Sequence, residues 1–337
     1  MKKITHTSFD FSSDGVRGIY VNPQKQVEFI VKFPLDLPPH TFDTPQLLNQ
    51  NRDTFVGILK KAPAPTSYVS YLVPEDVIFT QLLEIPKVSL EEVPEAIYWK
   101  LKDLLPKDIE SYNKDYLILQ ETQKQYIVLT FAVPKYILTF FENVFKEVGL
   151  TPVALEPRAL ALHRASAPSL PSSHVVILDI TNEGTTLTYA TKEQVLFSQT
   201  LPVGNNTIIE KIQISTNTPR DKILEQIEQK KLDKKAVLEA LTQVTKQINT
   251  EFVRVSGFLS EEFSIKVNPK TILVTTSIPY FADTTVLALK STFSKEIDIK
   301  TLDIKSLVKL PPDLPQDALG VDFAAVLGLN LKREVYV

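Results

Sequence analysis

Two stretches of the chain alternate between apolar and polar residues in the same order. Residues 9–35 read FDFSSDGVRGIYVNPQKQVEFIVKFPL, and residues 178–203 read LDITNEGTTLTYATKEQVLFSQTLPV. Each stretch contains three short alternating runs separated by turn residues, which is typical of three antiparallel strands joined in sequence. We therefore predict a three-stranded meander in each region.

The two meanders also share individual residues. Aligning them pairs Asp10 with Asp179, Asp14 with Glu183, Gly15 with Gly184, Tyr20 with Tyr189, Val27 with Val195, Phe29 with Phe197 and Pro34 with Pro202. Chance similarity between two hairpins is the alternative explanation. The shared pattern favours a duplicated α/β fold with two similar halves.

Helical patterns follow each meander. Residues 44–62 place apolar side chains on one face, namely Leu47, Leu48, Phe55, Ile58 and Leu59. Gly204 precedes residues 205–212, for which we predict a short helix. After these, Thr218 can cap a helix with Pro219 in its first turn and Asp221 as its capping acid.

An apolar stripe then recurs at spacings of three and four, through Val237, Leu241, Val244, Ile248, Phe252, Val255 and Leu259. We predict one long helix from residue 218 onward, with this stripe packed in the core. A helix that lies on a membrane or binds a partner is the alternative.

A different pattern occupies residues 76–152. It predicts a strand over 77–85, a helix over 92–105, strands over 115–121 and 125–133, a helix over 135–148 and a strand over 152–155. Ser89 and Glu92 match a capping box, and Gly149 is a typical helix stop. This α+β insertion contains no reactive cluster, so we expect it to present a surface.

Composition excludes several kinds of chemistry. The 337 residues carry a net charge of −3, which gives no global attraction to nucleic acid. The chain has no cysteine, and its four histidines have no metal-ligand spacing. No signal peptide follows the first lysines, and Pro134 and Lys135 interrupt the most apolar window. We expect a cytoplasmic protein.

The order of these segments resembles the actin-like ATPase superfamily, and within it the PilM-like proteins of type IV pilus assembly, which are related to FtsA. Residues 71–106 resemble the entry to that family's inserted subdomain, and residues 144–165 resemble its exit. Residues 195–212 resemble the third strand and following helix of the second half, and residues 320–334 resemble the closing helix.

The resemblance implies a division of the chain into lobes. Residues 1–75, completed by 153–165 and 318–337, would form a first lobe that carries residues 76–152 as an inserted subdomain. Residues 166–173 would be a linker. Residues 174–317 would form the second lobe, with a mainly helical part at about 213–263.

The resemblance also implies a partner and a location. PilM-like proteins bind the cytoplasmic N-terminal peptide of the membrane protein PilN, in a groove between the first half and the inserted subdomain. We therefore expect a scaffold peripheral to the inner face of the cytoplasmic membrane. Other pilus platform or motor proteins are further expected partners.

A nucleotide site is the remaining implication. In the family, two loops approach the phosphates, each after a strand that ends in aspartate. The matching candidates here are Asp10, Ser12, Ser13, Arg17, Asp179, Thr181, Gly184, Thr185 and Gly204. Asp10 and Asp179 would hold Mg²⁺ if ATP binds.

The bulk of the loop residues argues against that site. Ser12 and Thr181 stand where the family has glycine, and Asp14 and Glu183 add negative charge near the phosphates. Residues 275–277, Thr-Thr-Ser, replace the glycine pair that lies against adenosine in the family. No residue stands out as a general base, so we expect no cofactor and no catalysis, and a pseudo-ATPase.

Two other functions stay open at this point, and a third finds no support. A working ATPase or nucleotide switch would keep the same fold. An FtsA-like filament protein would need an amphipathic anchor, and the chain stops at residue 337 soon after the closing helix. A sugar kinase would need a catalytic aspartate and a sugar pocket, for which we find no motif.

Overall fold

The computed structural model describes residues 4–35, 37, 38, 40–170, 174–315 and 318–332. The chain divides into two compact units, Met1–Arg164 with Val326–Val337 and Ala165–Ala325. We call these the first and second unit.

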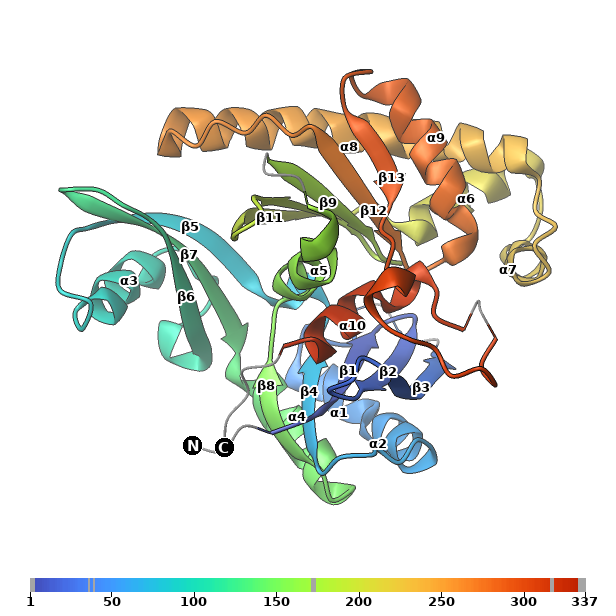
Figure 1. Ribbon diagram of the computed structural model, residues 1–337, viewed down its shortest axis with the longest axis horizontal. Helices are drawn as coiled ribbons and strands as arrows, with labels where there is room; N and C mark the ends of the chain where they lie inside the picture. The colour runs from blue at the N-terminus through green and yellow to red at the C-terminus, as the bar shows by residue number, and fades with distance from the viewer. Residues whose placement is uncertain (1–3, 36, 39, 171–173, 316–317, 333–337) are drawn as a thin grey trace. The chain divides into compact units, whose positions relative to one another are not determined.

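The first unit is built on a five-stranded sheet in the order β3-β2-β1-β4-β8 (Figure 1). Its strands are β1 (Thr7–Ser12), β2 (Gly15–Val21), β3 (Val27–Pro34), β4 (Tyr68–Leu72) and β8 (Thr151–Leu155). The first three strands pair antiparallel, whereas β4 lies parallel to β1 and β8 lies parallel to β4. The meander predicted for residues 9–35 is therefore confirmed.

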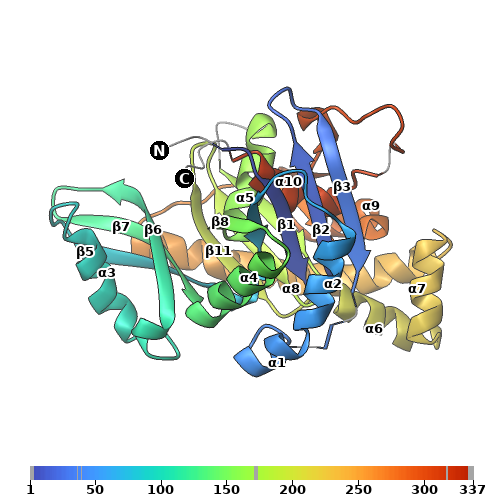
Figure 2. The ribbon, with the colours of Figure 1, turned by 90° about the horizontal axis from the view of Figure 1, so that it is seen from below.

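Helices α1 (Pro45–Gln50), α2 (Arg52–Lys61) and α4 (Lys135–Glu147) pack together on this unit (Figure 2). Thr44 caps α1 by accepting a hydrogen bond from the main-chain nitrogen of Leu47. Aromatic rings pack against the sheet, and the ring centroids of Phe11 and Phe141 lie 4.6 Å apart. Phe55 and Phe145 are fully buried in the same cluster. This apolar core fixes the position of β1, and with it the turn between β1 and β2.

The inserted subdomain forms a separate three-stranded sheet in the order β5-β7-β6, with α3 beside it (Figures 1 and 2). Its elements are β5 (Phe79–Pro86), α3 (Val93–Lys102), β6 (Tyr112–Glu121) and β7 (Gln125–Pro134). Val93, Ile97 and Leu101 face its core, as the helical pattern predicts. The predicted order of strands and helices is correct.

Several boundaries of the insertion differ from the prediction, and β6 starts at Tyr112, three residues before the predicted strand. A 3₁₀ turn (Glu75–Val77) precedes β5, so the strand starts two residues later than expected. Helix α3 ends at Lys102 and not at residue 105. Ser89 and Glu92 do bond to each other, but they lie in the turn before the helix. Gly149 adopts a φ of 75° after α4, as a helix stop requires.

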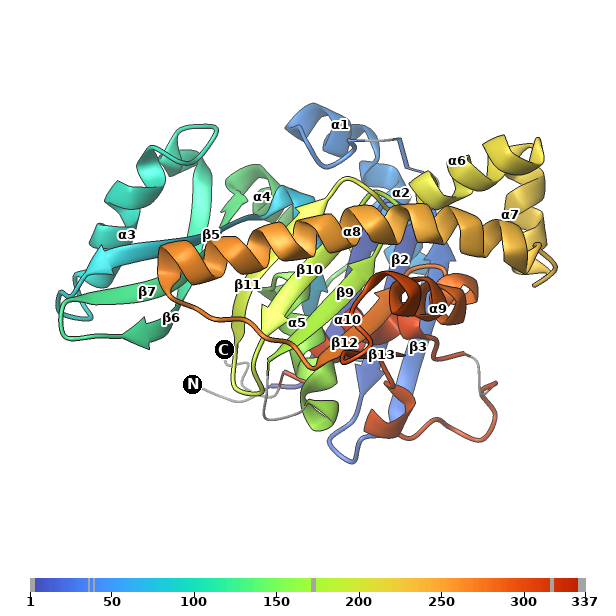
Figure 3. The ribbon, with the colours of Figure 1, turned by 90° about the horizontal axis from the view of Figure 1, so that it is seen from above.

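The second unit repeats the strand order of the first, β11-β10-β9-β12-β13 (Figure 3). Its strands are β9 (Val175–Ile180), β10 (Thr185–Ala190), β11 (Val195–Leu201), β12 (Thr271–Thr276) and β13 (Asp298–Thr301). The strand register shifts after Tyr20 in the first unit and after Tyr189 in the second. Because the sequence alignment pairs these two tyrosines, the duplication extends to the irregularities of the strands.

Helix α8 runs along the second sheet and contacts α6 and α9 (Figure 3). The helices of this unit are α6 (Asn205–Thr216), α7 (Arg220–Glu228), α8 (Lys234–Phe263) and α9 (Ala282–Thr292). The predicted single helix from residue 218 is wrong, because two helices cover that region. Lys230 has a positive φ of 56° between them, and the Asp233 side chain caps α8. Most of the predicted apolar stripe is buried on α8.

Helix α5 (Arg158–Ser166) follows β8, and a 3₁₀ turn (Ala167–Ser169) follows it. The predicted linker therefore starts within helical structure, and its residues 171–173 lie outside the described residues. The closing segment forms a 3₁₀ turn (Val321–Phe323) and α10 (Ala324–Asn330), with residues 333–337 outside the described part. Across the described residues, no helix combines the length and the apolar character needed to span a membrane.

Candidate functional site

The predicted site residues fall into two groups, one in each unit. In the first unit they surround the tight turn between β1 and β2, where Ser12 pairs directly with Gly15. Asp10 lies within β1, opposite Arg17 of β2, and is 1% exposed. Ser13 lies in the turn and is half-buried.

The carboxylate of Asp10 is held by an arginine from a distant part of the sequence. Arg158, at the start of α5, places Nη1 2.7 Å from one oxygen of Asp10 and 2.6 Å from the other. The main-chain nitrogen of Arg158 also donates to Glu75 at 2.8 Å. Arg158 thus joins β1, α5 and the turn that leads into the inserted subdomain.

A second ion pair closes the turn itself. Arg17 donates to Asp14 at 2.7 Å, and the hydroxyl of Ser12 donates to the other oxygen of Asp14 at 2.6 Å. Burial raises the pKa of Asp14, but the charge and hydrogen bond of Arg17 outweigh burial and hold that pKa below its ordinary value. Arg17 and Ser12, which the sequence predicts to bind phosphate, therefore donate to Asp14 of the same turn.

In the second unit, Asp179 of β9 is 3% exposed and lies opposite Thr186 of β10. Its carboxylate accepts a hydrogen bond of 2.6 Å from the hydroxyl of Thr275 on the parallel strand β12. Thr275 is one of the residues that the resemblance places at the position of a glycine pair. Its side chain is directed at Asp179 and is 1% exposed.

The turn between β9 and β10 is bound by the start of helix α6. The main-chain nitrogens of Asn205 and Asn206 donate to the carbonyl oxygens of Thr181 and Asn182, at 2.8 and 3.0 Å. Free amides at a helix start commonly bind anions. Here two of these amides bind carbonyl oxygens of the turn.

The two predicted glycines of the second unit, Gly184 and Gly204, lie close to main-chain atoms. A Cβ atom on Gly204 would approach the Thr181 carbonyl oxygen to 2.5 Å, and one on Gly184 would approach the Leu201 carbonyl oxygen to 2.7 Å. Packing within the unit therefore explains the absence of a side chain at both positions.

The predicted hydroxyl groups of the second unit also have partners there. Thr181 donates to the Gly184 carbonyl oxygen at 3.0 Å, and Thr185 donates to the Val203 carbonyl oxygen at 2.6 Å. The buried amide of Asn205 donates to the hydroxyl of Ser277 at 3.0 Å. The loop is a hydrogen-bonded hairpin that is anchored to α6 and β12.

The sequence reasoning missed Arg158, Glu75 and Asn205. One signal for Arg158 was available, because a cation at a helix start is opposed by the helix dipole and therefore needs an acidic partner. The sequence did not indicate which acid that is.

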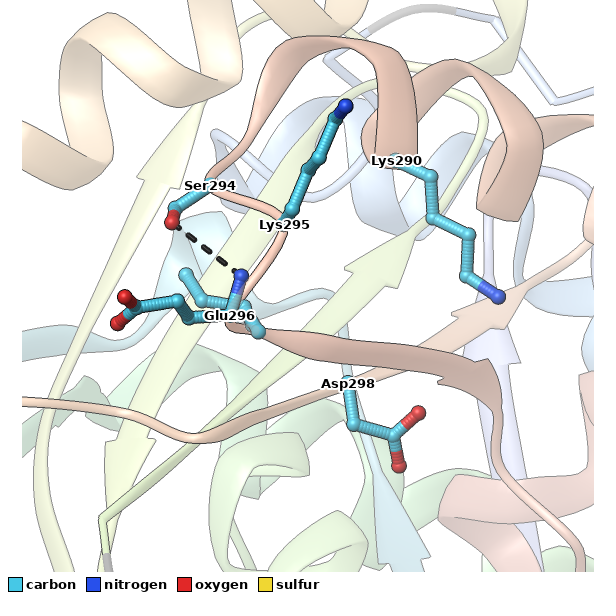
Figure 4. Close-up of a pocket in the computed structure, with 6 residues that line it drawn as sticks. Lys290, Ser294, Lys295, Glu296 and Asp298 are labelled. Carbon is cyan, nitrogen blue, oxygen red and sulfur yellow. Dashed lines mark hydrogen bonds between the residues drawn. The ribbon is translucent and has the colours of Figure 1, made fainter.

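A shallow hollow of about 450 Å³ lies in the second unit, where α9 leads into β13 (Figure 4). The side chains of Lys290 and Lys295 diverge along its wall (Figure 4). The carboxylate of Glu296 lies 3.9 Å from the ammonium nitrogen of Lys270, and the carboxylate of Asp298 lies 2.9 Å from that of Lys300. With charges of both signs and no convergent polar groups, the hollow gives no ligand site.

Comparison with solved structures identifies the fold. A chain of the PilM–PilN type IV pilus biogenesis complex superposes with a TM-score of 0.79, at 19% sequence identity, over 98% of this chain and 98% of that one. The present chain has the actin-like fold. The predicted resemblance and fold class, duplicated and with an insertion, are confirmed at the level of structure.

Other structures match with lower scores. A ROK family glucokinase from Streptomyces griseus, in complex with glucose and AMPPNP, gives a TM-score of 0.52 at 9% identity, covering 96% of this chain and 97% of that one. The ethanolamine utilization protein EutJ from Carboxydothermus hydrogenoformans gives 0.51 at 9% identity, covering 96% and 91%. No protein-family profile matches the sequence, and the comparison with curated proteins gives no match either.

Proposed function

We propose that this chain is a scaffold of a type IV pilus assembly platform, located at the inner face of the cytoplasmic membrane. In this role it binds the cytoplasmic N-terminal peptide of a PilN-like membrane protein. The observation that carries the proposal is the superposition on the PilM–PilN complex, with a TM-score of 0.79 over 98% of both chains. The glucokinase and EutJ share the fold with scores of only 0.52 and 0.51.

The inserted subdomain supports this proposal because it exposes apolar side chains. Nine large apolar side chains of the described residues are exposed, and four of them belong to the insertion, namely Leu90, Trp99, Leu104 and Leu117. Trp99 is 58% exposed on α3. Exposed aromatic and aliphatic groups are typical anchors for a peptide, so this part of the surface suits the proposed role.

The polar groups of the two turns also favour a scaffold over an ATPase. Asp10 and Asp14 bond to arginines, and Asp179 bonds to Thr275. Each of these carboxylates already has an internal partner in its own unit. This arrangement supports a pseudo-ATPase.

Peptide binding can be tested with the full chain. The probe is a fluorescein-labelled synthetic peptide that covers the cytoplasmic N-terminus of the PilN-like protein of the same genome. A peptide of scrambled order and equal composition is the control. We expect saturable fluorescence anisotropy with the native order only.

Hydrogen–deuterium exchange should then locate the bound peptide. We expect slower exchange within residues 76–152 when peptide is present. Absence of binding, or slowed exchange confined to the second unit, would contradict the proposal. Micromolar binding of ATP with Mg²⁺ in calorimetry would favour a nucleotide switch instead.

A further inference from the structure

The ion pair between Asp10 and Arg158 is almost fully removed from solvent. The side chains of Arg158 and Asp10 are 8% and 1% exposed. A single nitrogen of the guanidinium contacts both carboxylate oxygens, at 2.7 and 2.6 Å. Both oxygens through which Asp10 would reach a metal, or a water of its hydration shell, are therefore engaged by a cation of the chain.

The neighbouring aspartate also has its own counter-ion within the first unit. Asp14 is paired with Arg17 at 2.7 Å, and the charge of Arg158 also acts favourably on Asp14. Two aspartates thus face two arginines around the turn. A divalent cation added at either aspartate would meet a guanidinium group of the same sign.

Exchange of Arg158 for a metal ion would be unfavourable. The ion would have to displace Arg158 from Asp10, which would leave a buried guanidinium without its counter-ion. The main-chain nitrogen of the same residue donates to the side-chain carboxylate of Glu75 at 2.8 Å. That bond fixes the start of α5 to the turn before β5.

We infer that Arg158 is a permanent internal counter-ion of Asp10, in the place that the family resemblance assigns to Mg²⁺, and that the first unit binds neither magnesium nor the phosphates of a nucleotide. The residues present do not fit the cofactor implied by the fold. The arginine supplies the positive charge that the aspartate requires, and that charge does not depend on any ligand.

The first test is thermal unfolding of the full chain with Mg²⁺ alone, ATP alone or both at millimolar concentration. We expect an unchanged midpoint for the wild type. A ligand present at about one hundred times its dissociation constant would raise the midpoint by on the order of 5 °C. A rise of that size that disappears in Asp10→Asn would overturn the inference.

The second test is a double-mutant cycle with Arg158→Met and Asp10→Asn, alone and combined. Each single variant leaves one buried charge without its counter-ion, so we expect each to lower the midpoint of thermal unfolding. We expect the double variant to unfold well above the temperature that additive effects predict. Additive effects would mean that Arg158 only fills space, which would overturn the inference.

A surface pair provides the matched control. Arg254 and Glu251 form an ion pair on α8 whose side chains are 61% and 18% exposed, and Arg254→Met and Glu251→Gln should combine almost additively. If Arg158→Met gives no folded protein, Asp10→Asn alone decides. Its midpoint should fall, and an unchanged midpoint would refute the pairing.

Discussion

Replacement of Asn330 by alanine should destabilise the first unit by about 3 kcal/mol. Asn330 ends α10 and is 8% exposed. Its Oδ1 accepts from the main-chain nitrogen of Val21 at 2.9 Å. Its Nδ2 donates to the carbonyl oxygens of His6 and Ile19 at 2.8 and 3.3 Å, and lies 3.0 Å from the Ser8 hydroxyl. One amide therefore joins the end of α10 to β2 and to the start of β1.

The magnitude follows from the groups that would lose their partner. Ser8 keeps a hydrogen bond to Ser70, so it is left out of the sum. The other three groups are main-chain atoms, and two of them belong to residues that are at most 4% exposed. An unsatisfied buried polar group costs about 1–3 kcal/mol, and we take the lower end because the carbonyls of a sheet have strand partners as well.

Asn330→Asp keeps the acceptor oxygen of the amide and removes its donor nitrogen, so it tests the two ends of the side chain separately. The remaining oxygen can still accept from Val21, but the second oxygen would face the carbonyl oxygens of His6 and Ile19. The carboxylate form should therefore be disfavoured, and the pKa of the new aspartate should be raised. A raised pKa means that stability is lost as the pH rises through it, so the variant should recover towards wild type in acid.

Urea unfolding followed by the fluorescence of Trp99 provides the assay. Trp99 is the single tryptophan of the chain and belongs to the first unit. A loss of about 3 kcal/mol should lower the midpoint by roughly 1 M or more. Asn113→Ala, on the exposed side of β6, is the control and should change stability by less than about 0.5 kcal/mol. A loss below about 1 kcal/mol for Asn330→Ala, or Asn330→Asp equal to wild type near pH 7, would refute the reasoning.

Three further outcomes follow from the same structure. Gly204→Ala should cost about 1–3 kcal/mol in urea unfolding, because its Cβ would meet carbonyl oxygens of the β9–β10 turn at 2.5 and 2.6 Å; a neutral effect would contradict that packing. Gly57→Ala, in the middle of α2 with open space around its Cβ, should instead stabilise by up to about 1 kcal/mol, and a loss would show a contact that the structure lacks. Burial raises the pKa of Glu156, but Arg164 and Lys332 outweigh burial and hold it below the ordinary value of 4.5. A pKa lowered by folding stabilises above the unfolded pKa and ceases to do so as the pH falls through the folded one, so the deficit of Glu156→Gln should shrink below about pH 4, and a constant deficit would argue against the pairing.

The strands were predictable because their pattern is local. Side chains of the meanders alternate between the two faces of a sheet, and short runs of this period between turn residues mark the strands, even though β1, β2, β9 and β10 are buried on both faces. The break between α7 and α8 was harder to predict, because the predicted helix joined the start signals at residues 218–221 to an apolar stripe that begins only at Val237. Asp233 was the available signal, since an aspartate just before a periodic run is a typical cap.

The partners of the candidate site were not predictable in the same way. Asp10 and Arg158 are separated by 148 positions, and Asp179 and Thr275 by 96. Neither spacing belongs to a local motif, because the parallel strand pairing and the packing of α5 create both contacts. The resemblance implies that Thr275 stands in place of a glycine, whereas only the structure shows that its hydroxyl binds Asp179.

The two halves bind a buried aspartate at equivalent positions with different partners. Each half places an aspartate at a nearly solvent-free position of its first strand, opposite Arg17 in one case and Thr186 in the other. A buried carboxylate needs hydrogen bonds or a counter-ion wherever it occurs. The first half supplies the guanidinium of Arg158, and the second half supplies the hydroxyl of Thr275. Because each carboxylate has a partner within its own unit, the presence of the two aspartates alone does not argue for a nucleotide.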